Sequence, residues 1–344
     1  MIKVAMIGFG GIAQIHRYAY WLLAQQGVPV KLVAACDRNP DCFKTKTKIN
    51  LPLPDFDDGN AFGQYLDSDE MLAKEDVDMV DICLPTKLHA PLSIQMLQKG
   101  YAVLSEKPMA TSFAECEQML AATEGNYNRL MIDQCVRFYP EYMYIKALIR
   151  SGAYGKVKAA EFLRYSPLPT WSKDNWQSNS AQSGGCLAEL NIHDIDVMRY
   201  FFGEPEAFDC KIQSNVYEED YAESHFYYPD LEVKVHSGWM DPSEAFRHGY
   251  TVEFERATVR FADGKVTCIE DGKETVQPIE PKDGIINAIA YFVKVLSEGI
   301  ENTENPPTDS AKTLLLLEQL RESHNAGGVK MKWEIPQLQT GGNK

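Results

Sequence analysis

The sequence predicts an α/β domain built on a doubly wound parallel sheet, followed by an α+β domain with a large, mostly antiparallel open sheet. In the first third of the chain, short runs of Val, Ile, Leu and Ala alternate with amphipathic stretches. This alternation is typical of buried parallel strands joined by helices. From residue 207 to 278, β-rich runs follow one another without an intervening helix, which favours antiparallel strands.

The length and charge of the chain limit what it can be. Its 344 residues are about twice a typical single domain, so we expect two domains, at 1–127 and 128–338, and a disordered tail at 339–344. Lys and Arg number 34 against 49 Asp and Glu, a formal net charge of −15. This excess disfavours nucleic acid and anionic membranes as partners and favours a small-molecule ligand.

The cysteines and the N-terminus favour a cytoplasmic protein. The eight cysteines are scattered singly and form no C-x-x-C pair, so we expect reduced thiols. The opening "MIKVAMIGFGG" is too short an apolar run to span a membrane and lacks the layout of a signal peptide.

The elements expected in the first domain alternate regularly. Strands are expected at 2–8, 30–37, 77–85 and 101–108, and helices at 11–27 and 88–100. Right-handed crossovers between such strands produce a doubly wound sheet.

The second domain is expected to contain helices and then several consecutive strands. A helix at 140–152 leads into an alternating strand at 156–167, and a second helix is expected at 184–203 between a pair of glycines and Gly203. Strands are expected at 207–217, 222–228, 232–240, 248–255 and 257–272, and helices at 284–299 and 308–325.

A glycine-rich turn after the first strand predicts a dinucleotide site with a Rossmann-type architecture. Its spacing is G-x-G-x-x-A, it opens a helix, and the acid Asp37 ends the second strand. Asp37 is expected to bind the adenosine ribose hydroxyls, which favours NAD, while Arg38 could meet a 2′-phosphate and leaves NADP open. The alternative is a turn needed only for packing. The residues of the turn are Gly8, Phe9, Gly10, Gly11, Ile12 and Ala13.

Two further strand exits are expected at the same sheet edge, where ligands bind in open α/β sheets. "LPTKLH" supplies Pro85, Thr86 and His89, and "SEKP" supplies Glu106 and Lys107. The alternative for any single lysine is a solvated side chain.

The helix expected at 184–203 carries a polar stripe. At 100° per residue, Glu189, His193, Asp196 and Tyr200 fall on one narrow face. Periodicity alone does not decide whether this face meets solvent or a ligand. A zinc site is disfavoured because no further ligand set is recognisable, and we expect no metal.

Together these motifs resemble the glucose–fructose oxidoreductase/inositol dehydrogenase (Gfo/Idh/MocA) family of NAD(P)-dependent sugar and polyol oxidoreductases. The resemblance covers nearly the whole chain and is clearest in residues 1–205, at "GFGGIA", "CDRNP", "DICLPTKLHA", "SEKPMA", "VRFYPEY" and "GGCLAELNIHDID". It implies oxidation of a secondary alcohol of a sugar, cyclitol or related polyol. It also implies a homodimer or homotetramer assembled through the second domain's sheet.

The resemblance also implies residue roles. Lys107 matches the lysine of the Glu-Lys-Pro motif, and His193 matches the catalytic histidine, placed by the resemblance on the nicotinamide side. Glu189 stands where many members carry aspartate. As a base His193 would take the alcohol proton, and Lys107 would stabilise the alkoxide.

Substrate contacts and rival functions stay open at this point. A sugar subsite could be lined by residues near the expected helix, although packing roles are the alternative for each. Some relatives cleave glycosides through transient oxidation, and at least one regulatory protein shares the fold, so both remain rivals. The candidate substrate contacts are Arg164, Trp171, Trp176 and Asn191.

Overall fold

The computed structural model describes residues 1–44, 53–59, 61–168, 177 and 179–336. Within these ranges the chain forms two compact units. The first contains residues 1–135 and 283–311, and the second contains residues 136–282 and 312–336. The division differs from the single break expected near residue 127, because 283–311 belongs to the first unit.

The first unit is built on a parallel sheet of six strands among the described residues. The strand order is β3-β2-β1-β4-β5-β6, the doubly wound arrangement that the alternating sequence predicts. The strands are β1 Ile2–Ile7, β2 Val30–Cys36, β3 Gly63–Tyr65, β4 Met79–Ile82, β5 Ala102–Ser105 and β6 Leu130–Ile132.

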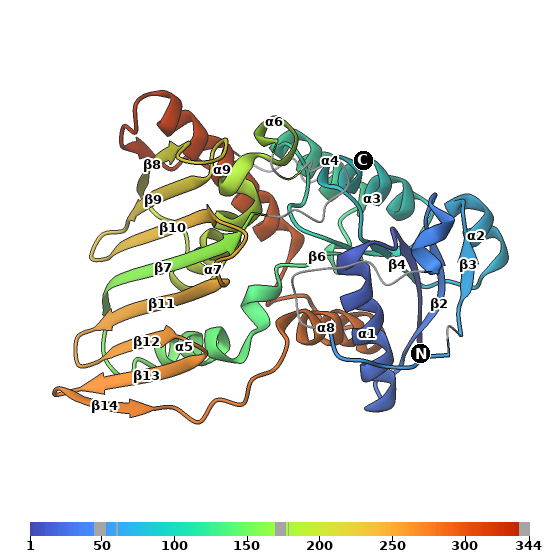
Figure 1. The fold of residues 1–344 in the computed structure, drawn as a ribbon, viewed down its shortest axis with the longest axis horizontal. Helices are drawn as coiled ribbons and strands as arrows, with labels where there is room; N and C mark the ends of the chain where they lie inside the picture. Colours follow the sequence, from blue (N-terminus) through green and yellow to red (C-terminus); the bar gives the residue numbers. More distant parts are fainter. Residues whose placement is uncertain (45–52, 60, 169–176, 178, 337–344) are drawn as a thin grey trace. The chain divides into compact units, whose positions relative to one another are not determined.

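Helices cover both faces of this sheet, with α1 and α8 together on one side and α3 and α4 on the other (Figure 1). Because α8 packs against α1 and β1, it joins the first unit although it lies late in the chain. The bounds of these helices are α1 Gly11–Gln25, α2 Ser68–Lys74, α3 His89–Gln98, α4 Phe113–Ala122 and α8 Gly284–Glu298.

The second unit contains a sheet of nine strands among the described residues, ordered β14-β13-β12-β11-β7-β10-β9-β8-β15. Neighbouring strands are antiparallel except for β7 and β10, which pair in parallel. The strands are β7 Val157–Pro167, β8 Ala207–Gln213, β9 Tyr221–Tyr227, β10 Glu232–Met240, β11 Arg247–Phe254, β12 Thr258–Ala262, β13 Lys265–Glu270, β14 Lys273–Val276 and β15 Met331–Lys332.

Helix α7 packs against β7 and β10 of this sheet (Figure 1). Alternate residues of β7 and β9 are buried, so one face of the sheet forms the core of the unit. The other face keeps partly exposed polar pairs, including His225–Glu223 and His236–Glu161. The remaining helices are α5 Pro140–Ser151, α6 Ser180–Ser183, α7 Ile192–Phe202 and α9 Pro307–Asn325, the last crossing from the first unit into the second.

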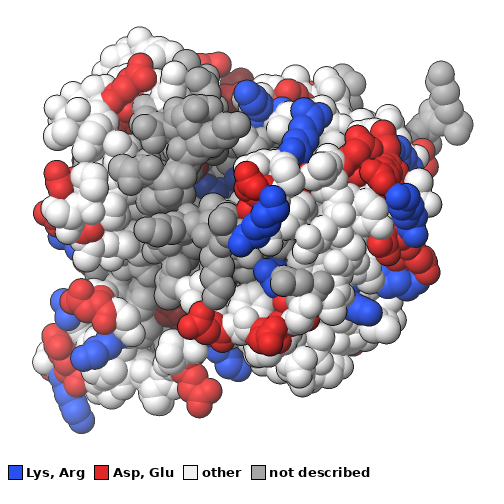
Figure 2. Space-filling view, turned by 45° about the vertical axis from the view of Figure 1, so that its right-hand side comes forward, with Lys and Arg blue, Asp and Glu red and all other residues white. Residues whose placement is uncertain are grey.

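The surface carries charges of both signs. On the face drawn in Figure 2, Lys and Arg side chains are interspersed with Asp and Glu over the described residues. On this face the described residues therefore show no broad patch of a single sign. None of the helices formed by described residues combines the length and apolarity required to cross a bilayer.

Candidate functional site

The predicted glycine turn has the geometry that a dinucleotide needs. Gly8 adopts a φ of +91°, and a Cβ added there would lie 2.3 Å from the carbonyl oxygen of Cys83, so only glycine fits. A Cβ added at Gly10 would meet nothing within 4 Å, which leaves open space at this point of the turn. The turn therefore combines close contact with the residues that follow β4 on one side and room for a ligand on the other.

The first turn of α1 is suited to an anion. No side chain caps this helix end, and the turn contains no acidic residue. The backbone N–H groups and the positive end of the helix dipole are consequently available for phosphate. The residues present fit the pyrophosphate of a dinucleotide.

Asp37 lies where β2 ends, beside the glycine turn. Its Oδ2 accepts the backbone N–H of Phe9 at 2.9 Å, and its Oδ1 accepts that of Asn39 at 2.8 Å. These bonds fix the carboxylate, and each oxygen retains a second lone pair for a hydroxyl donor. The neighbouring Arg38 is exposed.

The loop after β4 is tied to the loop after β5 by a buried histidine. His89 is 1% exposed; its Nε2 lies 2.6 Å from the carbonyl oxygen of Leu84 and its Nδ1 lies 2.7 Å from that of Pro108. Both ring nitrogens of His89 therefore contact backbone carbonyl oxygens of the protein. The predicted contact of His89 with the cofactor stays a prediction. Pro85 is half-buried and Thr86 is buried in the same loop.

Lys107 follows β5 at the carboxyl edge of the sheet. It is half-buried, and the Lys107–Pro108 peptide bond is cis. Its backbone N–H donates to Oε2 of Glu106 at 3.0 Å. Because β1, β4 and β5 are neighbours, the glycine turn, the Pro85 loop and Lys107 follow adjacent strands at one edge, as the sequence predicts.

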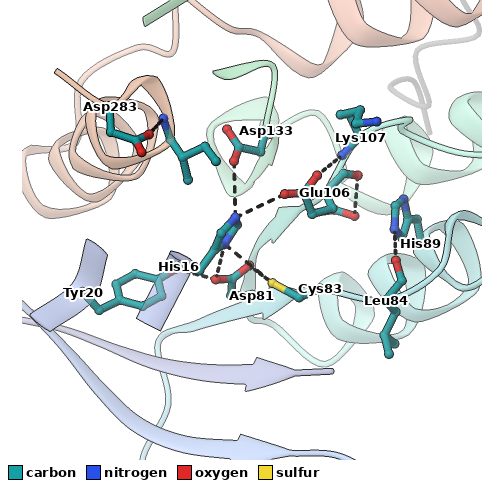
Figure 3. A network of polar contacts seen from close by, with 12 residues as sticks. His16, Tyr20, Asp81, Cys83, Leu84, His89, Glu106, Lys107, Asp133 and Asp283 are labelled. Carbon is teal, nitrogen blue, oxygen red and sulfur yellow. Dashed lines mark hydrogen bonds and ion pairs between the residues drawn. The ribbon is translucent and has the colours of Figure 1, made fainter. Parts of the chain in front are cut away.

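A buried polar cluster that sequence reasoning missed adjoins Glu106 (Figure 3). His16 on α1 is fully buried, with its Nδ1 2.9 Å from Oδ2 of Asp81 and its Nε2 3.2 Å from Oε1 of Glu106. The same Nε2 lies 3.4 Å from Oδ2 of Asp133. Tyr20 donates its hydroxyl to Asp81 at 2.8 Å.

The cluster shifts the proton affinity of its members. Burial alone would lower the pKa of His16, but the charge of Asp81 and the hydrogen bonds to Asp81 and Asp133 raise it well above its ordinary value. Burial alone would raise the pKa of Glu106, yet the hydrogen bond and charge of His16 lower it. Burial raises the pKa of Asp133 to about 7 although His16 acts against it.

In the second unit, a π-helical turn precedes the helix that carries His193. The π-turn spans Leu187–Asn191 and continues directly into α7, which ends before Gly203 at a φ of +77°. The helical segment follows the glycine pair Gly184 and Gly185, which have positive φ, as the sequence predicts. The π-turn changes the angular spacing over residues 187–191. The placement of Glu189 and His193 on one face stays a prediction.

The polar face of α7 is not a solvated one. Asp194 is fully buried and accepts two hydrogen bonds from Arg164, at 2.8 and 3.0 Å. Asp196 is 1% exposed and accepts two from Arg137, at 2.6 and 2.8 Å. His193, which precedes both acids, is half-buried, and the two ion pairs fix the first turns of the helix that carries it.

The remaining predicted residues also have definite surroundings. Glu189 is 5% exposed, and Gln177 donates to its Oε2 at 3.4 Å. Asn191 is fully buried; it donates to Ser237 at 3.0 Å and accepts from Ser224 at 3.4 Å. Trp171 and Trp176 lie outside the described residues.

Comparison with known proteins identifies the family. Residues 2–134 match the oxidoreductase family with an NAD-binding Rossmann fold, and residues 142–265 match the C-terminal domain of the GFO/IDH/MocA proteins. A levoglucosan dehydrogenase from Pseudarthrobacter phenanthrenivorans is 25% identical, covering 78% of this chain and 67% of its own. An inositol 2-dehydrogenase from Rhizobium meliloti is 25% identical over 59% of this chain and 56% of its own.

The fold agrees with that assignment. The solved structure of a levoglucosan dehydrogenase in complex with NADH and levoglucosan superimposes with a TM-score of 0.81 at 18% identity, covering 98% of this chain and 100% of that one. The chain spans about half the length of the first curated relatives that it matches. This chain belongs to the Gfo/Idh/MocA family of oxidoreductases and has an NAD-binding Rossmann domain.

Proposed function

We propose that this protein transfers a hydride between a nicotinamide cofactor and a secondary alcohol of a sugar, cyclitol or related polyol. The observation that carries the proposal is the sheet edge of the first unit, where Lys107 follows a strand two places from the glycine turn. The names of the relatives, levoglucosan dehydrogenase and inositol 2-dehydrogenase, support this substrate class.

The cofactor would be held by the glycine turn and the second strand. The N–H groups at the start of α1 would bind the pyrophosphate, and Gly10 leaves room for it. The Asp37 carboxylate would accept the ribose hydroxyls and repel a 2′-phosphate, which favours NAD, while the exposed Arg38 leaves NADP open. When bound, the nicotinamide supplies the hydride acceptor or donor.

The protein's own residues would manage the proton and the charge. His193 would take the proton of the reacting hydroxyl, because histidine titrates near neutral pH. Lys107, as an ammonium group, would stabilise the developing alkoxide. Glu189 would orient His193 or bind a neighbouring hydroxyl. Lys107 and His193 belong to different units, and the proposal requires both for a single turnover.

Two of the candidate substrate contacts, Arg164 and Asn191, are already bonded to other side chains of the protein. The charge of Arg164 is compensated by Asp194, so an additional contact with a sugar hydroxyl would use a guanidinium N–H without bringing net charge. The amide of Asn191 is already bonded to two serines, which makes it a support of the π-turn as well as a candidate contact.

A panel of polyols and sugars with NAD and with NADP tests the function. We expect absorbance near 340 nm to grow with at least one free polyol or sugar and to grow faster with NAD. Cofactor binding without turnover on any member would refute the proposal and favour a sensing role. Glycoside cleavage without net cofactor reduction would instead favour the hydrolase alternative.

The assembly remains part of the same proposal. The half-exposed face of the nine-stranded sheet would pair with a second copy, giving a homodimer or homotetramer. Sedimentation equilibrium at micromolar concentration tests this, and a monomer throughout the concentration range would refute it.

A further inference from the structure

The buried cluster around His16 contains more ionisable groups than packing requires. Asp81, Glu106 and Asp133 come from the ends or interiors of three neighbouring strands and converge on one imidazole (Figure 3). The exposed fractions of His16, Asp81 and Asp133 do not exceed 1%. Burying so many charged groups costs several kcal/mol unless they are paired, so the arrangement calls for a role.

A short chain of contacts joins this cluster to the backbone of Lys107. Oε1 of Glu106 faces Nε2 of His16 at 3.2 Å, and Oε2 of the same carboxylate accepts the Lys107 N–H at 3.0 Å. Glu106 itself is anchored, because its own N–H donates to the carbonyl oxygen of Ile82 on β4 at 3.1 Å. The carboxylate therefore lies between the buried imidazole and the residue proposed to be catalytic.

The surrounding donors indicate which group carries the charge. Tyr20 and Cys83 both donate to Asp81, which marks that carboxylate as an acceptor on both oxygens. Nδ1 of His16 must then donate to Asp81. Its Nε2 faces the oxygens of Glu106 and Asp133, and Oε2 of Glu106 is already an acceptor. An imidazolium that donates from both nitrogens satisfies these contacts without a protonated Glu106.

We propose that Glu106, held in place by a His16 imidazolium, is a positioning residue that fixes the backbone of Lys107 at the sheet edge. The inference rests on the proposed function of Lys107. A hydrogen bond from a backbone N–H to a carboxylate is stronger than a neutral one and is directional, so it sets where the lysine side chain begins. A displacement of about 1 Å at such a site can cost about 100-fold in rate.

The loop is held at a second point, which keeps the test interpretable. His89 binds the carbonyl oxygen of Pro108 at 2.7 Å and ties it to the loop after β4. Loss of the Glu106 carboxylate therefore releases the N–H of Lys107 while the following residue stays attached. A metal ion held by His16 with Asp81 and Cys83 is a weaker interpretation, since an imidazolium has no lone pair to offer a cation.

Two measurements test the inference without any substrate. In nitrogen NMR of histidine-labelled protein, assigned with a His16→Asn variant, we expect both His16 nitrogens to be protonated at pH 7.5. In hydrogen exchange, we expect the Lys107 amide to be protected in the wild type and in Glu106→Gln, whose amide oxygen can still accept. In Glu106→Ala it should exchange at least about tenfold faster. A neutral His16, or an unchanged exchange rate in Glu106→Ala, would overturn the inference.

Kinetics then separate this inference from the proposed function. We expect Glu106→Ala to lower kcat by about 10- to 100-fold with the cofactor Kd within a few-fold, and Glu106→Gln to recover most of the rate. Glu115→Gln is the matched control, because Glu115 also accepts a backbone N–H, that of Thr111, on an exposed turn. If Lys107→Met keeps full activity, the proposed function of Lys107 fails. If Lys107→Met is inactive and Glu106→Ala is fully active, only the positioning role fails.

Discussion

Replacing Asp133 by asparagine should change how stability depends on pH. Burial raises the pKa of this carboxyl from 3.8 to about 7 in the folded protein, where it faces His16, Glu106 and Asp81. Between these two values the folded state keeps a proton that the unfolded state has released, so stability falls as pH rises from about 4 to about 7. Asparagine cannot ionise and removes this loss.

The expected magnitude follows from the separation of the two pKa values. Each pH unit inside the window contributes about 1.4 kcal/mol, so the full window sets an upper limit of about 4 kcal/mol. Between pH 5 and pH 7 the variant should gain about 3 kcal/mol over the wild type. For a unit of this size, that gain corresponds to about 6–12 °C in Tm.

Thermal unfolding followed by circular dichroism at pH 5, 6, 7 and 8 measures the effect. The Tm difference between Asp133→Asn and the wild type should be smallest at pH 5 and reach a plateau above pH 7. Gln95→Ala, a change at an exposed side chain of α3 that removes no ionisable group, is the control and should leave the Tm difference independent of pH. Parallel curves for Asp133→Asn and the wild type would refute the reasoning.

Two further variants test the turn and the helix. Gly8→Ala places a Cβ 2.3 Å from the carbonyl oxygen of Cys83 at a φ of +91°. We expect the cofactor affinity, measured by fluorescence titration, to fall at least about tenfold. Unchanged affinity would contradict the proposed role of the turn. Arg137→Met leaves the Asp196 carboxylate buried without its guanidinium partner and should destabilise the second unit by about 3–5 kcal/mol in urea unfolding. Adding Asp196→Asn should restore part of the loss, and no restoration would contradict the ion-pair explanation.

Much of the first unit can be predicted from the sequence because its signals are local. The glycine spacing, the apolar strand before it and Asp37 after the next strand are read within about 40 residues, and the structure confirms the β1–α1–β2 arrangement. The three-residue strands β3 and β6 were missed because three residues show no measurable periodicity. Helices α1 and α8 were both predicted, but their packing against each other was not. Nothing in the local sequence specifies a contact between segments more than 250 residues apart.

The buried cluster shows where sequence reasoning stopped and what signal was available. Asp81 lies inside the apolar run "VDMVDICLP", and a buried strand carboxylate requires a partner. That partner, His16, lies 65 residues earlier, and its further contacts with Glu106 and Asp133 depend on the order of the strands. The sequence pattern indicates that Asp81 needs a partner, but it does not identify His16 as that partner.

The stripe that contains His193 shows a different limit. A regular helix was assumed from residue 184, whereas Leu187–Asn191 form a π-turn that changes the angular spacing. Within the stripe Asp196 is buried, and Asp194 beside the stripe is buried as well, so this part of the helix does not face solvent. Their partners, Arg164 and Arg137, lie on segments that periodicity within the helix cannot reveal.

The most direct test measures turnover and cofactor affinity together in Lys107→Met and His193→Ala. With the polyol or sugar that supports the fastest reduction of NAD, we expect both variants to lose turnover while the Kd for NAD stays within a few-fold of the wild type. Retained turnover in both variants would contradict the assignment of these two residues to the chemistry.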